Sequence, residues 1–120
     1  MHELSIAQSI FDAIEAKADQ CQASHIRSVH LQVGEASGIM LDSLTSCFEM
    51  LASTDQMTQG AQLQIDVVPH RAFCPHCAKE FAVKQLVAQC PGCGQWSDEI
   101  ISGTELRILE MEIDSVEAPH

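Results

Sequence analysis

Hydrophobic positions near the start of the chain recur at the three- and four-residue spacing of an α-helix. The apolar stripe consists of Leu4, Ala7, Ile10, Phe11, Ile14 and Ala18. Polar side chains such as Asp12, Glu15 and Asp19 occupy the opposite side. This periodicity predicts an amphipathic helix over about residues 4–19, with one face turned toward a core.

A shorter stripe with the same period predicts a second helix. Its apolar members are Leu44, Cys47, Phe48 and Leu51. Asp42 and Ser43 stand just before this stripe, and both residue types favour the N-cap position, so we expect one of them to cap the helix.

Three other segments alternate between apolar and polar residues, which is typical of half-buried strands. Residues 28–33 end at Gly34, and residues 62–67 are followed by Pro69. The third segment, residues 105–113, changes phase between Ile108 and Leu109. A β-bulge would explain that change, and so would a central strand buried on both faces.

The order helix, strand, helix, strand, cysteine-rich segment and strand predicts an α+β fold. We expect a small three-stranded sheet covered by two helices, with an inserted zinc-ribbon subdomain. Residues 1–69 and 98–120 would form the α/β domain, and residues 70–97 would form the ribbon. A chain of 120 residues has room for one such core and a small metal-stabilised unit.

Two C-x-x-C pairs, Cys74 with Cys77 and Cys90 with Cys93, predict a metal site in this ribbon. Four thiolates complete the tetrahedral shell of a structural Zn²⁺, which leaves no open position for hydrolysis. Disulfide bonds are the competing interpretation, but they require an oxidising compartment. Iron in a rubredoxin-like electron-transfer module is an alternative. A zinc-ribbon binding protein, with nucleic acid as its partner, is another. His76, inside the first pair, is either an exposed loop residue or tunes the zinc.

Charge narrows these alternatives. The formal net charge is −11, and the ribbon has too few lysines and arginines to bind phosphates, so nucleic acid is not expected as a partner. The first residues lack the basic and apolar regions of a signal peptide, and no apolar run is long enough to cross a bilayer. These features favour a cytoplasmic protein that does not bind membranes.

The first three residues suggest a second metal site, in which Met1, His2 and Glu3 hold nickel. The Met1 amine, the His2 amide nitrogen and His2 Nδ1 can chelate a metal in one plane, with Glu3 or an outside ligand beside them. Planar nitrogen and oxygen donors favour Ni²⁺ or Cu²⁺. Because His2 is second and not third in the chain, one corner of the plane is open, which suits a carrier that releases its metal.

Four motifs together resemble one known family. Met1-His2-Glu3-Leu4-Ser5, residues 33–38 (VGEASG), the two cysteine pairs and residues 103–108 (GTELRI) are similar, in this order, to the HypA/HybF nickel metallochaperones of hydrogenase maturation. The resemblance covers nearly the whole chain. It implies a carrier and not an enzyme, with Ni(II) as cargo at Met1, His2 and Glu3 and structural zinc at the four cysteines.

The same resemblance implies partners. Members of this family work with a nickel-binding maturation GTPase and deliver nickel to the large subunit of [NiFe]-hydrogenase, and some also serve urease. A monomer or weak homodimer is expected. The chain itself has no G-x-x-x-x-G-K-[ST] phosphate-binding loop, so a step driven by nucleotide would have to come from the partner.

Overall fold

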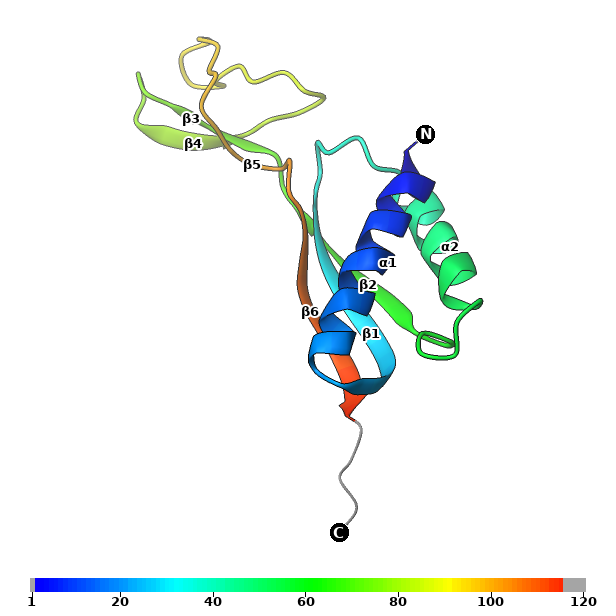
Figure 1. Cartoon of the computed structure of the whole chain (residues 1–120). Helices are drawn as coiled ribbons and strands as arrows, with labels where there is room; N and C mark the ends of the chain where they lie inside the picture. Colours follow the sequence, from blue (N-terminus) through cyan, green and yellow to red (C-terminus); the bar gives the residue numbers. More distant parts are fainter. Residues whose placement is uncertain (1, 116–120) are drawn as a thin grey trace. The chain divides into compact units, whose positions relative to one another are not determined.

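A computed structural model describes residues 2–115 and contains both predicted helices (Figure 1). Helix α1 (Glu3–Gln20) buries Ala7, Ile10, Phe11, Ile14 and Ala18, as its apolar stripe predicts. Helix α2 (Leu41–Ala52) packs against α1. The rings of Phe11 and Phe48 meet edge to face, with 6.3 Å between their centroids. The two predicted stripes therefore face each other in one core.

The start of α2 differs from the prediction. Neither Asp42 nor Ser43 is the N-cap, because the helix begins at Leu41 and Met40 occupies the capping position without a side-chain cap. Instead, the Met40 backbone N–H donates a hydrogen bond to Oε2 of Glu3, at 3.0 Å. A carboxylate from the first turn of α1 thus accepts a hydrogen bond from the backbone where α2 begins.

The main sheet has three strands in the order β2-β1-β6, and Figure 1 shows α1 and α2 on one of its faces. Strand β1 (Ala23–Gly34) lies in the centre and buries Val29, Leu31 and Val33. Strands β2 (Gln62–Val68) and β6 (Leu106–Ser115) form the two edges. Because β6 is an edge strand with mostly exposed residues, the alternative of a central strand buried on both faces is wrong.

A second, smaller sheet has the order β4-β3-β5. Strand β3 (Arg71–Cys74) pairs antiparallel with β4 (Lys79–Ala82) and with β5 (Ile100–Ser102). The irregular segment between β4 and β5 contains the second cysteine pair. Strand β5 lies beyond the predicted end of the ribbon because its pairing with β3 is not visible in any local pattern.

The chain separates into two compact units. One contains residues 1–31, 39–65 and 108–120, and the other contains residues 32–38 and 66–107. The predicted domains, residues 1–69 with 98–120 and residues 70–97, stay a prediction, since compactness alone does not show which segments fold independently. No helix within residues 2–115 has both the length and the apolar character needed to span a bilayer.

Two glycines make a very close backbone contact in the second unit. A Cβ atom on Gly34 would lie 2.1 Å from the carbonyl carbon of Gly103. A Cβ atom on Gly103, whose φ is +111°, would lie 2.5 Å from Cα of His70. His70 is buried, with 8% of its surface exposed. These contacts give the family-like segments 33–38 and 103–108 a structural role.

A strained turn lies between Lys84 and Val87, which form an isolated antiparallel bridge. Its two central residues, Gln85 and Leu86, have φ values of +54° and +64°. Asparagine and glycine favour such two-residue turns because positive φ costs them little, whereas leucine adopts this conformation at a cost. Leu86 is also 74% exposed, so burial of its side chain does not offset the strain.

We therefore expect Leu86→Gly to stabilise the zinc-loaded protein by about 1 kcal/mol, because it removes the positive-φ penalty. Urea unfolding of both proteins measures the difference. The matched control is Ala82→Gly, at an exposed position of β4 without positive φ, which should lower stability. Equal changes in the two variants would contradict the strain at Leu86.

Candidate metal centre

The four predicted cysteines converge on one point. Their sulfur atoms all lie within 4.8 Å of one another. Cys74 and Cys93 Sγ are 3.6 Å apart, and Cys77 and Cys90 Sγ are 3.8 Å apart. Four sulfurs bound to one zinc at ~2.3 Å lie about 3.8 Å apart along the tetrahedron's edges. The cluster can therefore hold a metal ion, and its donor set and spacing fit zinc.

Backbone turns hold each cysteine pair in place. Cys74 ends β3, and the Cys77 N–H donates to its sulfur at 3.4 Å. In the second pair, the Gly92 N–H donates to Cys90 Sγ at 3.3 Å. The turns end at Ala78 and Gly94, which have φ values of +53° and +77°. The N–H groups point at sulfur and stabilise negative charge there, as a thiolate metal site requires.

The electrostatics of the four thiols are unequal. The backbone N–H of Cys93 lowers the pKa of the Cys90 thiol to about 7. Hydrogen bonding to Cys93 raises the pKa of the Cys77 thiol to about 12. Cys90 therefore loses its proton more readily than Cys77, and a metal that binds all four sulfurs must displace the protons that remain on them.

The core around the cluster is small. Within the described residues it consists of Ala72, Phe81 and Val83 together with Cys74 and Cys90, with Cys77, Ala88 and Cys93 packed against it. Two of the buried members are metal-site cysteines. Since so little apolar surface is buried, metal binding would supply much of the folding free energy of this unit.

His76 lies in the first pair but outside the cluster. Its side chain is exposed. Among the described residues, the cluster of potential metal ligands contains the four cysteines and does not include His76. The suggestion that His76 tunes the zinc stays a hypothesis.

At the other predicted site, the structure describes His2 and Glu3, while Met1 lies outside the described residues. His2 is exposed and is the N-cap of α1. Its backbone oxygen accepts a hydrogen bond from the Ile6 N–H at 2.8 Å, but its side chain makes no capping bond. The imidazole is therefore not used to cap the helix.

Glu3 is buried, with 7% of its surface exposed. The hydrogen bond from the Met40 N–H lowers the pKa of its carboxyl group to about 2, so Glu3 is ionised at neutral pH. One of its oxygens is already engaged by the backbone. Sequence reasoning missed this link because residues 3 and 40 belong to different helices and no local pattern connects them.

Comparisons with known proteins identify the family. A sequence model of the family described as "Hydrogenase/urease nickel incorporation, metallochaperone, hypA" matches residues 1–113. The hydrogenase maturation factor HypA of Geobacter metallireducens is 38% identical over 114 residues, which is 95% of this chain and all of that protein. This chain belongs to the HypA family.

Two further HypA proteins are also similar to this chain. The hydrogenase maturation factor HypA of Streptomyces avermitilis is 42% identical over 113 residues, covering 92% of this chain and 86% of that protein. The solution structure of the nickel metallochaperone HypA from Helicobacter pylori has a TM-score of 0.68 and 27% identity, covering 97% of this chain and all of that chain. Membership confirms the predicted family and fold and a maturation role in nickel incorporation, not catalysis.

Proposed function

We propose that this HypA protein binds Ni(II) through Met1, His2 and Glu3 and delivers it for maturation of [NiFe]-hydrogenase. The observation that supports this most directly is the family match, which begins at residue 1 and so includes these three residues. Structural zinc at Cys74, Cys77, Cys90 and Cys93 would hold the second unit in its fold. The protein would act in the cytoplasm, and urease is a second candidate destination for the nickel.

Two opposing charges at the first turn of α1 affect how well it can hold a cation. A helix N-terminus has a partial positive charge, which disfavours a metal ion. The ionised carboxylate of Glu3 offsets that charge. His2 is exposed one residue earlier, with its imidazole available to a metal. The hydrogen bond from the Met40 N–H engages one oxygen of Glu3, so we expect the main contribution of Glu3 to be its negative charge.

The proposed partners follow from the same role. A nickel-binding maturation GTPase would supply the nucleotide-driven step, and the hydrogenase large subunit would receive the metal. A carrier must hold nickel tightly enough to collect it and weakly enough to release it, which suggests micromolar-scale affinity.

We expect His2→Ala to abolish binding of nickel at this site, because it removes the imidazole and leaves the remaining donors without the second chelate ring. Isothermal titration of zinc-loaded protein with an authentic N-terminus measures this. The control is His76→Ala, which makes the same chemical change at another exposed histidine and should leave nickel binding unchanged. Normal nickel binding by His2→Ala would show that the cargo site is elsewhere.

The competing iron function predicts a different result. Protein purified without added metal would be red and contain iron if the four cysteines formed an electron-transfer site. Elemental analysis that finds one zinc per chain, in colourless protein, is the outcome that the nickel carrier predicts.

A further inference from the structure

Strand β6 leaves one edge of the main sheet open to other strands. It is at the end of the order β2-β1-β6, so one row of its backbone N–H and C=O groups has no neighbouring strand within the described residues. Apolar side chains along it are exposed, including Ile108 at 37% and Leu109 at 43%. A long edge with exposed apolar side chains is a template for pairing with another strand.

The residues of β6 alternate between two faces. On the side of α1, a groove of about 390 Å³ runs between helix and strand. We call it the β6 groove. Its lining consists of Ala13, Ile14 and Lys17 of α1, Cys21 just after that helix, and Ile108, Leu109, Glu110, Met111 and Ile113 of β6, so apolar side chains predominate. Apolar side chains of an added strand would enter this groove.

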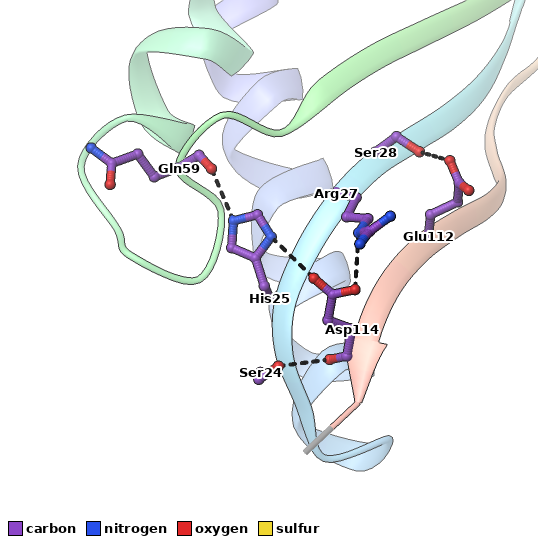
Figure 2. Close-up of polar contacts among 7 residues, drawn as sticks. All are labelled: Ser24, His25, Arg27, Ser28, Gln59, Glu112 and Asp114. Carbon is purple, nitrogen blue, oxygen red and sulfur yellow. Dashed lines mark hydrogen bonds and ion pairs between the residues drawn. The ribbon is translucent and has the colours of Figure 1, made fainter. Parts of the chain in front are cut away.

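The other face of β6 is acidic. Glu110 lies 3.5 Å from Nδ1 of His30, measured from its Oε1 atom. Glu112 Oε1 accepts a hydrogen bond from Ser28 at 2.8 Å, and Asp114 pairs with Arg27 at 2.9 Å (Figure 2). His25 adds a 3.9 Å approach to Asp114. Three carboxylates thus follow one another along this face, with one arginine and two histidines beside them.

We propose that the edge of β6 binds an extended strand from a basic partner protein, in which apolar residues alternate with lysine or arginine. Opposite charges facing each other across paired strands are favourable, and the chain's net charge of −11 attracts such a partner from a distance. The mostly apolar lining of the groove favours apolar residues of the added strand on that side, and Lys17, which also lines it, disfavours basic ones. This inference does not rest on the proposed nickel site.

A second copy of the chain fits this edge less well. An antiparallel pair of β6 strands related by a two-fold axis would place acidic face beside acidic face. Like charges across a strand pair are destabilising, and both chains have the same large negative charge.

The test uses a fluorescein-labelled ten-residue peptide that alternates valine and lysine, with both ends blocked. We expect binding with a dissociation constant on the order of tens of micromolar, weakened by salt, because backbone pairing and charge act together. Amide NMR signals of residues 108–114 should shift on binding. A peptide that alternates valine and glutamate should not bind.

Two variants distinguish peptide binding at the edge of β6 from a general attraction of the basic peptide to an acidic protein. Leu109→Lys blocks the groove, and Glu110→Lys reverses one charge of the acidic face. Each should weaken peptide binding at least tenfold. The matched control, Glu49→Lys, makes the same charge change at an exposed site on α2 and should change affinity less than twofold. Circular dichroism and zinc content check that all three variants fold.

Three outcomes would overturn the proposal. Equal weakening in Glu49→Lys would show attraction to net charge alone, and shifts confined to residues outside β6 would place the peptide elsewhere. A stable dimer that Leu109→Lys converts to a monomer, in the absence of peptide, would assign this edge to a second copy. Nickel titration of the same variants reports on the proposed cargo site independently.

Discussion

Gly103→Ala is expected to destabilise the protein by roughly 4 kcal/mol or more, because it combines backbone strain with a steric clash that cannot relax. The added Cβ atom would lie 2.5 Å from Cα and 2.8 Å from Cβ of His70. These are atoms close to or in the backbone, not the far end of a flexible side chain. In addition, φ at Gly103 is +111°, which residues with a Cβ atom rarely adopt.

Hydrogen bonds hold both sides of this contact. The His70 N–H donates to Glu35 Oε1 at 3.0 Å, and the His70 carbonyl accepts from the Val83 N–H at 2.8 Å. The Gly103 N–H donates to Glu105 Oε1 at 2.8 Å, and its carbonyl accepts from the Ala36 N–H at 2.7 Å. A shift that relieves the clash would therefore break at least one of these bonds.

Two other glycines provide matched controls for Gly103→Ala. Gly38 has a φ of +79°, and a Cβ atom added there would have nothing within 4 Å, so Gly38→Ala should cost only the conformational penalty of about 1 kcal/mol. Gly34→Ala isolates the steric part, since its Cβ would lie 2.1 Å from the Gly103 backbone. Urea unfolding of the three variants ranks them. Equal losses in Gly38→Ala and Gly103→Ala would contradict the close contact.

The close contact of Gly103 with Gly34 and His70 is a feature that the sequence alone does not reveal. The segments 33–38 and 103–108 resemble family motifs, but the residues themselves do not show why glycine is needed there. The reason is a contact between residues that are far apart in the chain. The hydrogen bond from Met40 to Glu3 was missed for the same reason, and so the N-cap of α2 was assigned to the wrong residues.

Helices and strands are easier to predict from the sequence than these long-range contacts, because they follow from local patterns. The stripe of α1 and the alternation of β1 each depend on one-sided burial within a single segment, which periodicity detects directly. The cysteine site was also predictable, because two residues of spacing let a single turn bring both sulfurs of a pair together. Strand order could not be read in this way. The position of β6 at an edge depends on pairing with β1, and the exposed side chains of β6 became visible only with that pairing.

The second large expected effect is the loss of the metal site. We expect Cys90→Ser to weaken zinc binding on the order of a thousandfold and to unfold the small sheet of β3, β4 and β5, because metal binding would supply much of the folding free energy of such a small core. Cys90 is buried and accepts a hydrogen bond from Gly92, and the backbone N–H of Cys93 lowers the pKa of its thiol. Helices α1 and α2 should persist, since their core of Ile14, Phe48 and neighbouring residues contains none of the four cysteines.

Hydrogen exchange followed by NMR measures both parts of this expectation. Amides of β3 and β4 should lose protection in Cys90→Ser, while those of α1 keep it. Cys21→Ser is the matched control, because Cys21 is exposed and lies outside the cluster, and it should bind zinc as the parent does. Full protection of β3 in Cys90→Ser would show that the small sheet folds without its metal. Equal loss of protection in α1 would show that the two units fold as one, and a metal at the four cysteines would then support the proposed nickel-binding end of the chain as well as its own ribbon.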